Sequence, residues 1–181
     1  MTEPAPPIVT TGVTTTYSSP WWTVEEHTVI ENGRPGLYNV LRCGDGVCVL
    51  PVTGSDVWLI REYKYAIGQH ILQLPSGSID EDEKPLAAAA RELLEETGLR
   101  AEAWRPLGII YPYPTNVASA VHLFIAQDAR PVQDPEPGVE LVRVSRTRVA
   151  NLIANHDITH AGSLVCLLTY LARQDRASAA G

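Results

Sequence analysis

The segment from Gly77 to Leu99 constrains the fold of this chain most, because its hydrophobic pattern has the period of a helix. Its apolar residues recur three, four, seven and eight positions after the first, which places them on one helical face. These residues are Leu86, Ala89, Ala90, Leu93 and Leu94. Asp82 or Asp80 is positioned to cap the start, and Gly98 is expected to end the helix. The segment therefore predicts a helix over residues 85–97.

Shorter stretches on both sides of this helix have the character of strands. We expect strands at residues 24–30, 37–41, 47–50, 57–60, 106–111, 120–126 and 138–144. The pair Asn32-Gly33 is typical of a tight hairpin turn. Two further helices are expected at about residues 146–155 and 163–173. Many strands with few helices predict an α/β sandwich.

The length and composition fit one principal folded domain. The chain has 181 residues, of which 45% are hydrophobic and 19% are charged, as in globular proteins. Residues 1–16 show no sustained period, and we expect a flexible leader there. Residues 17–51 are expected to form an N-terminal β-hairpin subdomain, residues 52–175 the main domain, and residues 176–181 a tail.

The charge balance limits the partners that the chain can bind. Lys and Arg number 14 and Asp and Glu number 21, which leaves a net charge of −7. Binding along a nucleic-acid backbone needs a basic surface, so no nucleic-acid partner is expected. No apolar run approaches the roughly 18 residues of a membrane-spanning helix, and the first residues lack the pattern of a signal peptide. We therefore expect a cytoplasmic protein with no membrane partner.

Three glutamates share one face of the predicted helix, because Glu92, Glu95 and Glu96 stand three and four residues apart. Like charges at this spacing oppose helix formation unless they are neutralised. The ordinary interpretation is a solvated acidic face in which Arg91 pairs with Glu95 one turn later. The alternative is that the carboxylates hold a hard divalent cation, which prefers oxygen ligands.

The residues around the three glutamates favour the second interpretation. Gly77, Glu83 and the run Arg91-Glu92-Leu93-Leu94-Glu95-Glu96-Thr97-Gly98-Leu99 match the Nudix box at every defined position. The segment resembles the Nudix hydrolases, which cleave nucleoside diphosphates linked to another moiety. The resemblance implies a Nudix-type α/β/α sandwich with a mixed sheet, plus the small N-terminal β subdomain.

By this resemblance the box forms a loop–helix–loop that holds Mg²⁺ or Mn²⁺ against a pyrophosphate. The implied metal ligands are Glu92, Glu95, Glu96 and, through its backbone carbonyl, Ser76. The glutamates and Arg91 form the implied catalytic set. Gly77 lets the loop pass close to the helix, since it has no Cβ atom. Glu83 and Arg91 are expected to orient the glutamates.

The flanking residues resemble the ADP-ribose and ADP-sugar pyrophosphatase branch of the family. The matching features are a strand end at residues 61–65, Leu74-Pro75-Ser76-Gly77 before the box, and Pro114 after it. This branch hydrolyses nucleoside diphosphate sugars, such as ADP-ribose to AMP and ribose 5-phosphate, and forms homodimers through N-terminal strands. The implied substrate contacts are Arg61, Tyr63, Lys64, Tyr113 and Pro114.

One departure from the branch concerns the loop after the box. The branch usually carries a catalytic glutamate there, whereas residues 111–122 contain no carboxylate. Either another group activates the attacking water, or the substrate preference differs, or the activity is reduced. Glu136 and Glu140 lie in a stretch rich in Pro and Gly and are possible loop acids, although loop charges are usually just solvated. The alternatives in function are a Nudix hydrolase of another nucleotide or sugar nucleotide, and a non-catalytic nucleotide-binding sensor.

Overall fold

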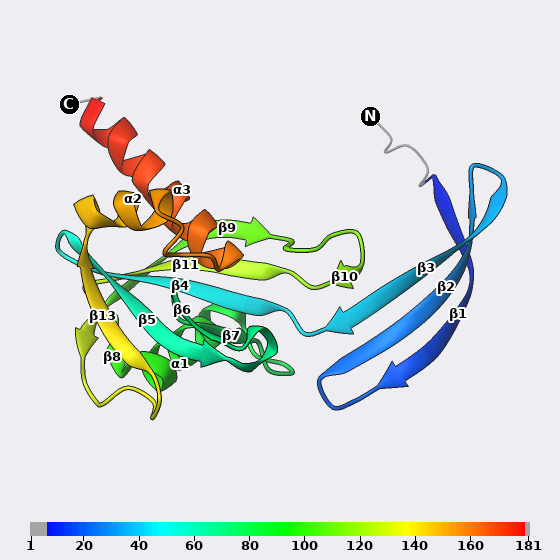
Figure 1. Cartoon of the computed structure of the whole chain (residues 1–181), viewed down its shortest axis with the longest axis horizontal. Coiled ribbons are helices and arrows are strands. Elements are labelled where there is room, and N and C mark those ends of the chain that lie inside the picture. The colour runs from blue at the N-terminus through cyan, green and yellow to red at the C-terminus, as the bar shows by residue number, and fades with distance from the viewer. Residues whose placement is uncertain (1–6, 180–181) are drawn as a thin grey trace. The chain divides into compact units, whose positions relative to one another are not determined.

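The computed structural model describes residues 7–179, and the side chains of residues 7–173 (Figure 1). Its contacts divide the chain into two compact units. We call them the N-terminal unit, which ends at Gly44 and also contains Tyr111–Ala120, and the main unit, which contains Asp45–Ile110 and the chain from Val121 onward. The predicted boundary between residues 51 and 52 therefore moves to residues 44 and 45, because the strand that starts at Gly46 belongs to the main sheet.

The N-terminal unit is a four-stranded sheet in the order β1-β2-β3-β10. Its strands are β1 (Ile8–Ser18), β2 (Trp22–Glu31), β3 (Arg34–Cys43) and β10 (Val117–Ala118). Strands β1 to β3 are antiparallel, and β10 pairs with β3 in parallel. The predicted hairpin turn is confirmed, since Asn32 and Gly33 join β2 to β3 with φ angles of 50° and 77°.

The prediction of a flexible leader was wrong for residues 8–16, which lie in β1. Threonines and valines favour extended backbone, and β1 pairs with β2 from Ile8 opposite Glu31 to Ser18 opposite Thr23. Nearly all residues of β1 are exposed, so neither face of the strand requires apolar side chains. A strand without a buried face has no alternation of polar and apolar residues, which is why its sequence shows no strand pattern. Residues 1–6 lie outside the described chain.

The main unit is built on a seven-stranded mixed sheet in the order β13-β5-β4-β11-β9, with β6 paired to β5 and β7 to β4. Its strands are β4 (Gly46–Thr53), β5 (Asp56–Lys64), β6 (Gln69–Gln73), β7 (Ser76–Ser78), β9 (Ala103–Ile110), β11 (Val121–Gln127) and β13 (Glu140–Ser145). Strand β11 is parallel to β4, whereas the other pairs are antiparallel. A separate two-stranded ladder joins β8 (Leu99–Arg100) to β12 (Arg130–Pro131).

Helices cover both faces of this sheet, with α1 (Pro85–Thr97) on one side and α2 (Arg146–Ala154) and α3 (Ala161–Ala179) on the other (Figure 1). Strand β4 shows why its sequence is apolar throughout. Val47 and Val49 pack with α1, whereas Cys48 and Leu50 pack with the α3 side. A strand buried on both faces reads as a continuous hydrophobic run. The predicted α/β/α sandwich with a mixed sheet is confirmed.

The helix predicted over residues 85–97 has those bounds, and Gly98 ends it with a φ angle of 68°. The predicted caps were wrong, because Lys84 is the N-cap residue and no side chain caps the helix. Asp80 instead lies in a turn, in which its carbonyl accepts a bond from the N–H of Glu83. Pro85 has no N–H group, so one of the donors that a cap would satisfy is absent.

Helix α3 is longer than the predicted residues 163–173, and its backbone extends to Ala179 into the predicted tail. A single 3₁₀ turn, η1 (Tyr65–Ile67), separates β5 from β6. None of the helices within residues 7–179 combines the length and the hydropathy that a membrane crossing requires.

Candidate functional site

Helix α1 presents its three glutamates to different surroundings. Glu95 is exposed, with 58% of its side chain accessible, whereas Glu92 has only 13% accessible. Glu96 is partly buried. The predicted carboxylate face is therefore not simply a solvated surface, since two of its three acids lie against the rest of the main unit.

The guanidinium of Arg91 connects the helix to the loop before it. Its Nη1 donates to Glu92 Oε1 at 2.7 Å and to Glu95 Oε2 at 3.2 Å. Its Nη2 donates to Glu83 Oε2 at 2.8 Å and to the carbonyl of Ser78 at 2.9 Å, and its Nε donates to Glu83 Oε1 at 3.1 Å. One arginine thus fixes two of the helix glutamates relative to Glu83, as their predicted orientation requires.

Gly77 lies on β7 and allows the loop to approach the helix closely. A Cβ atom at this position would lie 2.1 Å from the carboxyl carbon of Glu92. That carboxylate is already bonded to Arg91, so it cannot move aside without losing its partner. The position therefore requires a glycine, because the carboxyl group of Glu92 occupies the space that a Cβ atom would need. This close approach of the loop to the helix is the one that the sequence predicted.

The carboxylate of Glu96 turns toward the strand that precedes the helix. Its Oε2 accepts a hydrogen bond from the backbone N–H of Ser76 at 2.8 Å. Burial raises the pKa of Glu96 to about 8, and the negative charges of Glu62 and Glu92 add to this rise. Burial also raises the pKa of Glu92, although its bond to Arg91 opposes the effect. Without a cation, burial therefore favours the protonated form of Glu96 more than it would for a glutamate in water.

The sequence did not identify Glu62 as part of this site. Its Oε1 accepts a hydrogen bond from Gln73 Nε2 at 2.6 Å and contacts Lys64 Nζ. Glu62 and Lys64 lie two residues apart on β5, so their side chains share one face of the sheet. No short motif marks such an acid, because its partner Gln73 comes from the neighbouring strand β6.

Two of the predicted substrate contacts, Arg61 and Tyr63, alternate with Glu62 along β5 and so lie on its other face. Arg61 Nε lies 3.3 Å from Glu140 Oε2, directly across from it on β13. Tyr63 is exposed and packs edge-on against the ring of His70 at 5.3 Å. Lys64 therefore shares the face of Glu62, and its charge acts on Glu96, whereas Arg61 and Tyr63 lie on the other face of β5.

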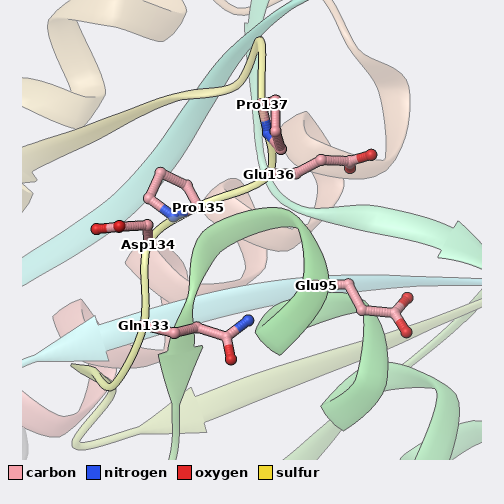
Figure 2. A pocket seen from close by; sticks show the side chains of 6 residues that line it. All are labelled: Glu95, Gln133, Asp134, Pro135, Glu136 and Pro137. Atoms are coloured by element: carbon pink, nitrogen blue, oxygen red, sulfur yellow. The ribbon is translucent and has the colours of Figure 1, made fainter.

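The two possible loop acids have different positions. Glu140 is not in a loop, because it is the first residue of β13, where its ladder with β5 begins at Arg61. Glu136 does lie in a loop, and its N–H donates to the carbonyl of Glu96 at 3.3 Å. Glu136 and Glu95 line one open pocket of about 430 Å³ together with Gln133, Asp134, Pro135 and Pro137 (Figure 2).

The remaining predicted contacts, Tyr113 and Pro114, belong to the N-terminal unit. Tyr113 is largely exposed, and its carbonyl accepts the N–H of Val117 at 2.9 Å. Substrate binding by these two residues stays a prediction.

A further residue near the acids that the sequence did not single out is His160, at the start of α3. Its Nδ1 lies 2.9 Å from Ser163 Oγ, which accepts the backbone N–H of Leu74 at 2.8 Å. Burial lowers the pKa of His160, and the charge of Lys64 lowers it further. These bonds attach the start of α3 to the segment between β6 and β7, next to the carboxylates.

The acids do not form a closed set of metal ligands. Among the described residues, no three His, Cys, Asp or Glu side chains converge in the geometry of a metal site. Five carboxylates nevertheless gather around Lys64 and Arg91, and the net charge of these seven groups is −3 when all of them are ionised. These carboxylates are Glu62, Glu83, Glu92, Glu95 and Glu96. Such a surplus of oxygen ligands fits a hard divalent cation.

Comparison with known proteins gives consistent matches. A family model described as the NUDIX domain matches residues 44–164. The chain is 24% identical over 142 residues to the "ADP-ribose pyrophosphatase" of Bacillus subtilis (strain 168), which covers 75% of this chain and 77% of that protein. It is 29% identical over 142 residues to the "ADP compounds hydrolase NudE" of Escherichia coli (strain K12), with 75% and 76% covered.

Among solved structures, that of an ADP compounds hydrolase superposes on this chain with a TM-score of 0.85. It is 25% identical, and the match covers 96% of this chain and 97% of that one. The similarity therefore extends over both units and is not confined to the carboxylate helix.

Proposed function

The chain belongs to the Nudix family, and on that premise we propose that it hydrolyses the pyrophosphate bond of a nucleoside diphosphate sugar, namely ADP-ribose. The family match and the named relatives make it a pyrophosphohydrolase. The observation that carries the proposal is the helix α1, whose glutamates are held by Arg91 and the loop at Gly77. A relative that acts on ADP-ribose, by its name, matches three quarters of the chain.

In the proposed reaction, water attacks one phosphorus and the bond from that phosphorus to the bridging oxygen breaks. The products are AMP and ribose 5-phosphate. Nudix hydrolases generally use divalent metals, and a bound cation would offset phosphate charge and lower the pKa of the attacking water. We propose Mg²⁺, with Mn²⁺ as a substitute. Its ligands would be Glu92, Glu95, Glu96 and the carbonyl of Ser76.

The other residues of the site position these groups. Arg91 and Glu83 hold two of the glutamates in place through charged hydrogen bonds, so the ligand oxygens need not be reorganised during the reaction. Lys64 adds a positive charge on the face of β5 near Glu96, which suits a contact with phosphate. We retain as further proposed substrate contacts Arg61, Tyr63, Tyr113 and Pro114.

The proposal is tested by a hydrolysis screen with nucleoside diphosphate derivatives in Mg²⁺ and in Mn²⁺, with AMP and sugar phosphate measured by chromatography. We expect ADP-ribose to be cleaved fastest. Faster cleavage of another nucleotide would favour the other substrate classes, to which the missing acid in residues 111–122 points. Tight binding of ADP-ribose by calorimetry with no product would instead indicate a sensor.

We also propose that the chain forms a homodimer through its N-terminal strands. Strand β1 is 11 residues long and lies at the edge of its sheet, so one side of its backbone has no strand partner in the described chain. Exposed apolar side chains on the same sheet include Val9, Val13, Tyr17 and Leu37. Light scattering should give twice the mass of the chain, and a monomer would contradict the proposal. The cytoplasmic location stays a prediction, which cell fractionation can test.

A further inference from the structure

The segment that joins β6 to β7 anchors two acids from different elements. The side chain of Gln73 donates to Glu62 on β5, and the backbone N–H of Ser76 donates to Glu96 on α1. Three residues of extended chain span at most about 10 Å between Cα atoms, so the two anchors lie close together. The carboxylates of Glu62 and Glu96 are consequently both held by the same short segment.

The two oxygens of Glu62 have different surroundings. Both contacts of this carboxylate, from Gln73 Nε2 and from Lys64 Nζ, are made to Oε1. Within the described chain, Oε2 has no hydrogen-bond or ion-pair partner, although only 18% of the side chain is accessible. An acid held by one oxygen, with the other free, is positioned to bind a ligand through the free oxygen.

A second observation comes from Gln73, which is fully buried. Its Nε2 is bonded to Glu62, but its Oε1 is the one buried side-chain atom without a hydrogen-bond partner among the described residues. A buried carbonyl oxygen normally has a donor or a cation nearby, because leaving it unpaired costs about 1–3 kcal/mol. The unpaired oxygen belongs to the same amide that holds Glu62, so an unused acceptor and a partly unused carboxylate occur together.

The charges around Glu62 suit a cation as the partner of its free oxygen. The carboxylates of Glu62 and Glu96 are anchored on one short segment, at Gln73 and Ser76. The Nζ of Lys64 contacts Oε1 of Glu62, so within residues 7–173 it leaves Oε2 without a positive partner. A divalent cation between the two acids would attract both of them.

We propose that Glu62 is a further carboxylate ligand of the divalent cation, bound through its free Oε2 from β5, opposite Glu96 on α1. This inference rests on the proposed function. It provides the site with an acid from β5, whereas residues 111–122 contain none. Gln73 and Lys64 are then positioning residues, which hold Oε1 so that Oε2 faces the cation.

The test is Mn²⁺ binding to the purified full chain, measured without substrate by calorimetry and by the EPR signal of free Mn²⁺. The variant Glu62→Gln keeps the size of the side chain and the bond from Gln73 but removes the charge. We expect its Mn²⁺ affinity to fall by about 10-fold or more. The control Glu102→Gln removes one charge from an exposed pair with Arg130, and its affinity should stay within about twofold of the original chain.

Unchanged Mn²⁺ affinity in folded Glu62→Gln would overturn the inference. If circular dichroism shows that this variant is unfolded, Glu62→Asp replaces it, because it keeps the charge and draws the oxygens back from the site. Its affinity should also fall, and equal affinity would again overturn the inference. The proposed function is tested separately. If the chain binds Mn²⁺ through Glu62 but does not cleave ADP-ribose, the proposed reaction is wrong and the inference about Glu62 still holds.

Discussion

At the scale of single residues, the chemistry depends on how the fold treats the carboxyl group of Glu96. This group is partly buried, is bonded to the N–H of Ser76, and has a pKa of about 8 in the metal-free chain. We predict that Glu96→Gln lowers kcat for ADP-ribose by about 100-fold or more, because an amide oxygen neutralises a cation far less than a carboxylate does. Steady-state kinetics measure this effect, with circular dichroism as the control for folding. A turnover near that of the original chain would refute the assignment of this glutamate.

Gly77 offers a test that leaves every charged group in place. In Gly77→Ala the new methyl group would meet the Glu92 carboxyl, which Arg91 holds by a 2.7 Å bond. We expect the carboxylate to be displaced, with an approximately 10-fold loss of metal affinity. The same variant should unfold at nearly the temperature of the original chain, since the clash is with the end of one side chain. If Mn²⁺ binds equally well to both proteins, the close approach has no role in the site.

The sequence identified some site residues and missed others for a physical reason. Glu92, Glu95 and Arg91 were predicted because they interact along one helix, where spacing determines which side chains meet. Glu62 was missed because its partner Gln73 lies on another strand, and strand pairing is not readable from a short motif. His160 was missed for the same reason, since Ser163 links it to Leu74, far away in sequence.

At the scale of elements, the end of α1 also positions a loop. Gly98 has a φ angle of 68°, and a Cβ atom there would lie 2.2 Å from the carbonyl oxygen of Gln133. We predict that Gly98→Ala destabilises the main unit in two ways. An L-residue in this conformation costs about 1 kcal/mol, and forcing the backbone of the loop away costs about 1–3 kcal/mol more.

Gly54 provides the matched control for this prediction. Its φ angle of 60° is similar, but nothing lies within 4 Å of the position of its Cβ atom. Gly54→Ala should therefore show only the conformational cost, and urea unfolding of both variants measures the difference. Equal destabilisation of the two variants would mean that the contact between Gly98 and the loop contributes nothing.

Elements with a buried face were predicted well, and elements without one were not. Strand β4 and helix α1 bury apolar side chains, so their hydrophobic patterns reveal their positions. Strand β1 is largely exposed, and the two-residue strand β10 pairs with β3 across a long stretch of sequence. The assignment of residues 111–120 to the N-terminal unit follows from that pairing, which no local pattern indicates.

At the scale of the whole molecule, the shifted carboxyl groups predict how stability varies with pH in the metal-free chain. A hydrogen bond from His27 lowers the pKa of Glu25, and hydrogen bonds from Arg91 lower the pKa of Glu83. The ionised forms of these two acids therefore stabilise the native state, and this stabilisation is lost as the pH falls below about 4.5. His160 has a lowered pKa, because the native state holds its ring buried in the neutral form. Below about pH 6.5 the unfolded chain binds a proton there more tightly, so the free energy of unfolding falls. Glu92 and Glu96 act in the opposite direction, because the native state holds their protons more tightly than the unfolded chain does.

For Glu96 the window is wide, since its pKa is 4.5 in the unfolded chain and about 8 in the native state. Between these values the native state binds more protons, so the free energy of unfolding falls as the pH rises, by up to about 1.4 kcal/mol per unit from this one group. We predict that Glu96→Gln, which cannot titrate, gains stability relative to the original chain from pH 5 to pH 8. Urea unfolding in EDTA at three pH values gives the free energy of unfolding of each protein. The effects of all other titrating groups cancel in the difference, because both proteins contain them. A constant difference across this range would mean that Glu96 is ionised in the native chain throughout, and the fold would then hold that charge without a cation.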